Sequence, residues 1–233
     1  MKITDHIEVT CENNLELMCR CSDNQFDLAL ADPPYFNGPQ NLGYFGNYYS
    51  SIGVKREAYN MIENWDVPGY DFYNELCRVS KHQIIWGINY FEFAGETPGR
   101  IIWDKLNGTN TFSDAEIASC SMHESIRMFK FLWNGMIQGK NFREGDVMQG
   151  NKKKNEKRIH ATQKPVALYK WILEKYCEPG FKILDTHFGS GSSGIACHDF
   201  GYDLTACDID VQCFNSAVNR LKEHTRQLRI NYG

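Results

Sequence analysis

Asp32-Pro33-Pro34-Tyr35 is the first group in this 233-residue chain whose residue types and spacing suggest chemistry. It directly follows the apolar run Phe26–Ala31, an expected strand that two successive prolines must end. A carboxylate on one N–H of an aromatic amine and a rigid carbonyl on the other localise the nitrogen lone pair. Asp32 and the Pro33 carbonyl supply such acceptors, and Tyr35 supplies a flat face for a base rotated out of a helix. The pattern indicates methylation of an exocyclic amino group; the alternative is a Pro-Pro turn with a capping aspartate.

A second group, Asp185 to Gly191 (DTHFGSG), lies between an expected strand and an expected helix. The glycines allow a ligand to approach the backbone closely, and the helix amino end offers free N–H groups. Asp208 ends the next expected strand about 20 residues after Gly189, where an acid can accept both ribose hydroxyls. This unit is typical of adenosine-bearing cofactors. The G-x-G-x-x-G spacing also fits a nicotinamide dinucleotide, although Asp185 favours an amine-bearing ligand over a phosphate; a plain strand-to-helix turn is the structural alternative.

The elements that must position these groups alternate along the chain, which predicts an α/β sheet with crossover helices in one domain, residues 1–233. We expect strands at 7–10, 26–31, 83–86, 100–103, 182–184 and 202–207, a strand pair within 113–133, and helices at 15–21, 70–79, 166–176, 193–200 and from 214 onward. Two segments interrupt this alternation: a Gly-, Asn- and Tyr-rich loop at about 36–68 and a polar stretch at about 134–161.

Composition narrows the class of protein. The chain is 42% hydrophobic and 23% charged, and it has neither an apolar run long enough for a membrane helix nor a signal-peptide core, so we expect a soluble intracellular protein. Nine cysteines without a C-x-x-C pair predict free thiols and no metal site. The net charge is −4, yet Lys152–Arg158 holds five cations and one anion. That run is either a solvated loop or a contact for phosphates.

Three motifs now occur in a recognisable order: Asp32–Tyr35, Thr162-Gln163-Lys164-Pro165, and the Asp185–Gly191 turn. This order resembles the amino-group DNA methyltransferases of the β class, most of all their small phage and prophage adenine-specific members. The similarity extends through residues 11–18, 86–91, 103–105, 112–118 and 128–135. It implies a Rossmann-like S-adenosylmethionine-dependent methyltransferase fold. In that fold a mostly parallel twisted sheet carries helices on both faces, and the order is permuted so that the catalytic motif precedes the cofactor motif.

The resemblance also assigns residues to roles. It implies a target-base site at Asp32, Pro33, Pro34 and Tyr35. It implies an S-adenosylmethionine site formed by Asn13, Thr162, Lys164, Pro165, Asp185, His187, Gly189, Ser190, Gly191, Ser192 and Asp208. The polar stretch 134–161 takes the place of a target-recognition segment, with Lys152, Lys153, Lys154, Lys157 and Arg158 as DNA contacts. Thr186 and His187 replace the proline and phenylalanine usual in the family, and Asn13 replaces a frequent aspartate.

Substrate and partners are expected as follows. Aspartate at the first motif position favours adenine N6 over cytosine N4, and no Pro-Cys dipeptide is present for covalent attack on cytosine C5. Direct in-line transfer to a flipped base in double-stranded DNA needs no metal. A recognition segment of fewer than thirty residues suggests low specificity, help from the loop, or a second copy of the chain. We expect action in the cytoplasm of a bacterial or phage-infected cell. Cytosine-N4 methylation, adenine methylation in RNA, and an inactive DNA-binding subunit remain alternatives; the DNA word and any restriction partner stay open.

Overall fold

A computed structural model describes residues 1–35, 66–108, 113–134, 137–160 and 162–226. Within these residues one sheet has eight strands, β1 (Ile7–Cys11), β2 (Phe26–Ala31), β3 (Ser80–Trp86), β4 (Arg100–Asp104), β5 (Ala115–Cys120), β6 (Ile126–Lys130), β9 (Lys182–Asp185) and β10 (Asp203–Asp208). The short strands β7 (Trp133–Asn134) and β8 (Ile137–Gln138) form a separate ribbon. The helices are α1 (Asn14–Cys19), α2 (Tyr70–Val79), α3 (Val166–Tyr176), α4 (Ser192–Phe200) and α5 (Val211–Arg226).

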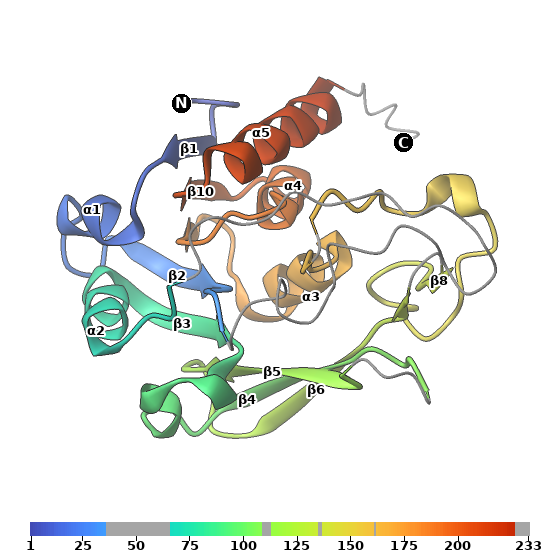
Figure 1. The fold of residues 1–233 in the computed structure, drawn as a ribbon, viewed down its shortest axis with the longest axis horizontal. Coiled ribbons are helices and arrows are strands. Elements are labelled where there is room, and N and C mark those ends of the chain that lie inside the picture. Colours follow the sequence, from blue (N-terminus) through green and yellow to red (C-terminus); the bar gives the residue numbers. More distant parts are fainter. Residues whose placement is uncertain (36–65, 109–112, 135–136, 161, 227–233) are drawn as a thin grey trace.

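The strand order is β1-β10-β9-β2-β3-β5-β4-β6 (Figure 1). The strands from β1 to β3 run parallel, β5 runs antiparallel to both of its neighbours, and β6 runs parallel to β4. The expected strands at 113–133 are present, but the prediction that they form a pair is wrong because β4 lies between them. The alternating residues Ile101 and Trp103 of β4 are almost fully buried, and an interior strand position provides that burial.

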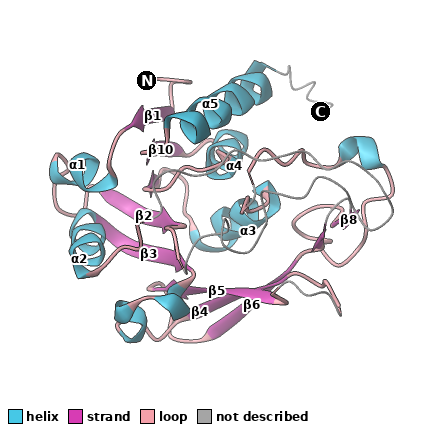
Figure 2. Ribbon diagram, viewed as in Figure 1, coloured by secondary structure: helices cyan, strands magenta, loops and turns pink. Residues whose placement is uncertain are grey.

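Helices cover both faces of the sheet, as predicted (Figure 2). Successive side chains of a strand point to opposite faces. Leu28 and Leu30 of β2 therefore join one buried cluster, which includes residues of α3, α4 and α5. Ala29 and Ala31 join the other, which contains Leu76 and further residues of α1 and α2.

Predicted and observed boundaries agree at both ends of β2, and α5 begins three residues earlier than predicted, at Val211. Helices α2 and α3 begin and end at the predicted residues, whereas β3 begins three residues earlier, at Ser80. Most of the predicted loop at 36–68 lies outside the described residues. Over the part of the chain that the structure covers, none of the helices combines the length and apolar character that crossing a membrane requires.

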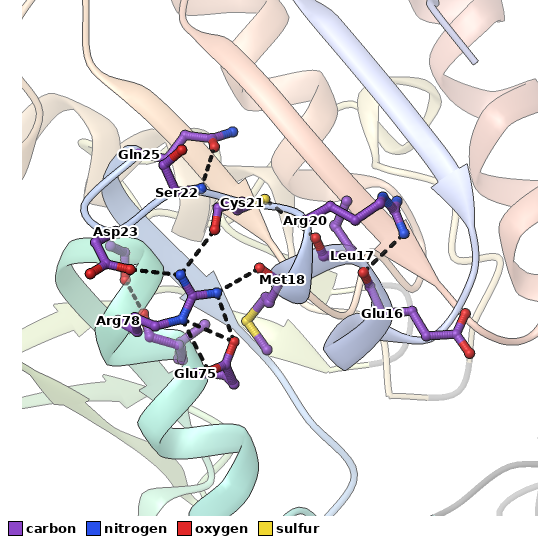
Figure 3. A network of polar contacts seen from close by, with 12 residues as sticks. Glu16, Leu17, Met18, Arg20, Cys21, Ser22, Asp23, Gln25, Glu75 and Arg78 are labelled. Atoms are coloured by element: carbon purple, nitrogen blue, oxygen red, sulfur yellow. Dashed lines mark hydrogen bonds and ion pairs between the residues drawn. The ribbon is translucent and has the colours of Figure 1, made fainter.

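Arg78, in the last turn of α2, joins α2 to the segment that follows α1 (Figure 3). Its guanidinium donates to the carbonyl oxygens of Met18 and Cys21, each at 2.9 Å. It also forms ion pairs with Asp23 and Glu75, both at 2.8 Å. This network closes the carboxyl end of α1 by satisfying carbonyl groups that a helix end leaves unpaired. It holds α1 against α2, so that the amino end of α1 has a defined position beside the site described next.

Candidate active site

The two sequence motifs meet at one edge of the sheet. Strand β2 pairs with β9 in parallel, with Leu30 opposite Asp185, so both strands end side by side. The residues that follow them line one cavity of about 360 Å³, within the usual range for small-molecule sites. The predicted residues in its wall are Asn13, Asp32, Pro33, Pro34, Tyr35, Thr162, Lys164, His187, Gly189, Ser190, Ser192 and Asp208. The two motifs therefore open into one shared cleft at adjoining strand ends.

One half of the cavity is formed by the glycine turn and Asp208. Gly189 and Gly191 have φ of +52° and +72°, a region that glycine adopts without strain. The N–H of Gly189 donates to Oδ2 of Asp208 at 2.7 Å, and the N–H of Asp210 donates to Oδ1 at 2.9 Å. Burial raises the pKa of Asp208 to about 6 in spite of these two bonds. Asp208 is thereby fixed in the wall, and each of its oxygens has a further lone pair for a ligand hydroxyl.

Asp185, Gly191 and Pro165 do not line the cavity. The Asp185 side chain is buried, accepts a hydrogen bond from the Ser193 hydroxyl, and accepts another from the His187 N–H at 3.0 Å. Burial raises its pKa to about 7. Asp185 thus holds the turn together from behind. Pro165 caps α3, and the cofactor roles expected for these three residues stay predictions.

His187 and the asparagines of α1 form the neighbouring wall. The amide nitrogen of Asn14 lies 3.0 Å from His187 Nε2, and His187 Nδ1 lies 2.9 Å from the Thr186 hydroxyl. Burial lowers the pKa of His187 to about 3, so the ring is neutral. Because the amide nitrogen can only donate, Nε2 accepts and Nδ1 carries the proton. Asn13 caps α1 by accepting the Leu15 N–H at 2.8 Å, which accounts for a short polar side chain at this position.

A buried group of four charges lies at the other half of the cavity, where two of its members, Asp32 and Lys164, line the wall. The ammonium of Lys164 pairs with Oδ1 of Asp32 and with Oε2 of Glu116, the latter at 3.0 Å. Lys105 pairs with Oε1 of Glu116 at 2.6 Å. Burial raises the pKa of Asp32, whereas burial alone would lower that of Lys164, which its two carboxylate partners instead raise. Burial also opposes ionisation of Glu116, but both lysines bring its pKa down to about 2. Lys164 and Glu116 therefore keep their charges at neutral pH.

The Tyr35 ring lies over this group. The Tyr35 ring is stacked on Tyr90, with centroids 5.1 Å apart and an interplanar angle of 12°. Its hydroxyl donates to Glu116 Oε2 at 3.4 Å, and the Lys164 ammonium lies 5.7 Å from the ring centroid. The sequence alone assigned no role to Glu116, Lys105 or Tyr90. They lie within segments that resemble the family, and only the strand order brings them to Asp32.

The predicted DNA-contact residues lie on the segment that leads to α3. Lys152, Lys153, Lys154 and Lys157 are exposed, as phosphate contacts must be. Arg158 is half-buried, with its guanidinium 4.3 Å from the centroid of the Trp133 ring, so it contributes to packing as well. The described part of this segment is 134, 137–160; residues 135, 136 and 161 lie outside the description.

Glu156 anchors that basic segment to the cavity wall. It accepts a hydrogen bond from Arg220 at 2.6 Å and from the first N–H of α3, Val166, at 2.9 Å. Arg220 also donates to the Ser190 carbonyl at 2.7 Å. Gln163, inside the Thr162–Pro165 motif, donates to the same carboxylate at 2.7 Å. One carboxylate thus connects the basic segment, the motif before α3 and the glycine turn.

The parallel strands of this α/β sheet end at a cavity that lies between a glycine turn and an Asp-Pro-Pro-Tyr corner. This arrangement is typical of the class of Rossmann-like methyltransferases. Residues 134–219 match the model of the N6/N4 methyltransferase family, described as DNA methylase. The Type II methyltransferase M.HinfI of Haemophilus influenzae is 24% identical over 240 residues, which cover 90% of this chain and 66% of that protein.

Solved structures agree in fold. The M1.HpyAVI–SAM complex matches with a TM-score of 0.55 and 17% identity over 91% of this chain and 98% of that chain. The cytosine-N4-specific PvuII DNA methyltransferase matches with a TM-score of 0.54 and 10% identity over 99% of this chain and 89% of that one. The family match over residues 134–219 and the similarity to M.HinfI support an assignment to the β-class amino-group DNA methyltransferases. The first of these structures is a complex with SAM, S-adenosylmethionine, the cofactor that the motif order also implies.

The chemistry of the lining fits that cofactor. Asp208 presents a fixed carboxylate for ribose hydroxyls, and the backbone at Gly189 has no side chain to hold a ligand away. His187 is neutral and Phe72 packs edge-on against it, with centroids 5.4 Å apart, so an uncharged imidazole and an aromatic ring stand beside the asparagines in that wall. No group of three or more potential metal-ligating side chains occurs among the residues that the structure describes.

Proposed function

We propose that this chain methylates the exocyclic N6 amino group of adenine in DNA by direct transfer, with the target base rotated into the cavity beside Asp32. One observation carries the proposal: the Asp32–Tyr35 corner and the glycine turn open into the same cavity. Bound S-adenosylmethionine supplies the electrophilic methyl group. The other side of that cavity offers the carboxylate of Asp32 and the backbone carbonyl of Pro33. An amino nucleophile needs two such acceptors for its N–H groups.

In this proposal Asp32 and Pro33 act on the amino group itself. Within the described residues, the ion pair of Asp32 uses Oδ1, which leaves Oδ2 to accept an N–H of the base. The Pro33 carbonyl, held by the ring of the next proline, accepts the second N–H. Two acceptors on one nitrogen localise its lone pair toward the methyl donor. The raised pKa of Asp32 favours its carboxylate as acceptor for the proton that the methylated nitrogen must lose.

Tyr35 and the basic segment bind the rest of the substrate. The Tyr35 ring, already supported by Tyr90, provides a surface for the flipped base. The exposed lysines of Lys152–Lys154 contact phosphates, which positions the duplex without reading its sequence. Asp208 binds the cofactor ribose, and Asp185 keeps the glycine turn in shape. In this proposal the enzyme acts in the cytoplasm of a bacterial or phage-infected cell.

The test is the identity of the methylated nucleoside. The protein is incubated with duplex DNA or RNA and methyl-labelled S-adenosylmethionine, and the nucleic acid is digested to nucleosides. Label in N6-methyladenosine from DNA supports the proposal. Label in N4-methylcytosine, or in RNA alone, replaces it with the corresponding alternative. Cofactor binding without any transfer supports an inactive DNA-binding subunit.

A further inference from the structure

Glu116 connects the residues of the target-base corner without touching the cavity. It lies on β5, the antiparallel strand between β3 and β4, and does not line the cavity. Its Oε1 pairs with Lys105 and its Oε2 with Lys164, at 2.6 and 3.0 Å. Oε2 also accepts the Tyr35 hydroxyl at 3.4 Å. A single carboxylate therefore contacts one residue of the corner directly and another, Asp32, through one lysine.

The charges in this group balance in pairs. Lys164 is 3% exposed, and a buried ammonium needs a carboxylate partner to be tolerated. If Asp32 were its only partner, an incoming amino group would compete with the full strength of that ion pair. With Glu116 present, Lys164 is shared between two carboxylates, and Lys105 neutralises the second of them.

Resting on the proposed amino-group chemistry, we infer that Glu116 is a positioning residue for it. Glu116 holds Lys164 behind Asp32 and the hydroxyl of Tyr35 at the same time, so that the free oxygen of Asp32 and the face of Tyr35 point at one base. Its negative charge matters as well as its shape, because the charge gives Lys164 a second carboxylate partner besides Asp32. Glutamine in its place retains an acceptor for Tyr35 and loses the hold on the lysine.

The charge role makes a prediction about pH that a merely structural role does not. The groups facing Asp32 from the surrounding elements are Lys164, Lys105, Glu116, Asp185, Tyr35 and Tyr169. Among them Glu116 raises the pKa of Asp32, and Lys105 lowers it. Methyl transfer requires ionised Asp32, so the rate rises with pH as Asp32 loses its proton. Glu116→Gln should therefore move this acid limb to lower pH, and Lys105→Gln should move it to higher pH.

The experiment compares these two variants with the wild-type enzyme and with Glu124→Gln, an exposed glutamate beyond the end of β5. For Glu116→Gln we expect kcat to fall about ten- to hundred-fold, the change that one charge-assisted hydrogen bond produces, with the Kd for S-adenosylmethionine within two-fold. The acid limbs of the two variants should shift in opposite directions, and Glu124→Gln should match wild type. Unchanged limbs, shifts in the same direction, or a parallel loss of cofactor binding would overturn the inference.

A second readout does not depend on activity. Titration of the Asp32 carboxyl by ¹³C NMR, assigned with Asp32→Asn, should give a lower pKa in Glu116→Gln and a higher one in Lys105→Gln. If wild-type protein transfers no methyl group, the proposed function fails, while these titrations still decide the role of Glu116. If Glu116→Gln does not fold, Lys105→Gln carries the test by itself, because the direction of its shift is fixed in advance.

Discussion

Asp32→Ala should abolish methyl transfer and leave cofactor binding nearly unchanged. In the transition state positive charge develops on the amino nitrogen, at hydrogen-bond distance from the Asp32 carboxylate. At about 3 Å and an effective dielectric constant of about 20, that attraction is about 5.5 kcal/mol before solvent and neighbouring dipoles offset part of it. A net loss of about 3–5 kcal/mol corresponds to a fall in kcat of about 10²- to 10⁴-fold.

Cofactor affinity should survive because the glycine turn and Asp208 stand on other strands. The fold should survive because Lys164 keeps its contact with Glu116, at 3.0 Å. The cost in stability should thus stay below the roughly 3–5 kcal/mol typical of a buried charge left without any partner. Asp32→Asn is a closer isostere and should show the same pattern.

The assay combines single-turnover transfer of labelled methyl groups with calorimetric titration of S-adenosylmethionine. Asp114→Asn, an exposed aspartate before β5, is the matched control and should behave as wild type. Equal loss of cofactor binding and of transfer in Asp32→Ala would show that Asp32 holds the structure or the cofactor. A kcat within ten-fold of wild type would remove Asp32 from the chemistry.

Three further predictions concern binding and stability. Replacing Lys152–Lys154 with alanine should weaken DNA binding and reduce the slope of log K against log salt by about 2.7, measured by fluorescence anisotropy, and an unchanged slope would contradict a phosphate contact. Asp208→Ala should raise the Kd for S-adenosylmethionine at least about ten-fold, with kcat at saturation much less affected; calorimetry measures the first and a reversed pattern would contradict it. The pKa of Asp185 is about 7 in the folded protein, whereas the ordinary value is 3.8. Between these pH values the folded state binds one more proton than the unfolded state, so the free energy of unfolding falls as the pH rises from 3.8 to about 7. The free energy of unfolding of Asp185→Asn, measured in urea, should therefore rise by up to about 4 kcal/mol relative to that of wild type between pH 4 and 7.5. A difference between the two proteins that stays constant with pH would show that Asp185 is ionised throughout.

Local patterns predicted most of the elements and both halves of the site. Helices α2 and α3 carry apolar residues at helical spacing and are bounded by glycine and proline, so their ends could be read directly. The cavity could be anticipated because the Asp32 corner and the glycine turn each follow a short apolar strand. Parallel strands that lie side by side end at one edge, and both corners come with them.

The sequence by itself determined where strands end in chemistry-bearing corners, because prolines, glycines and apolar runs act on their immediate neighbours. Only the tertiary structure decided that β4 separates β5 from β6, and that Glu116 and Lys105 reach Asp32. It also turned the Asp185 carboxylate inward, onto Ser193, where it does not line the cavity. Strand order depends on burial over the whole sheet. A buried ion pair depends on which charged side chains meet once the chain has folded. Neither leaves a periodic trace in the chain, since the partners are far apart along it.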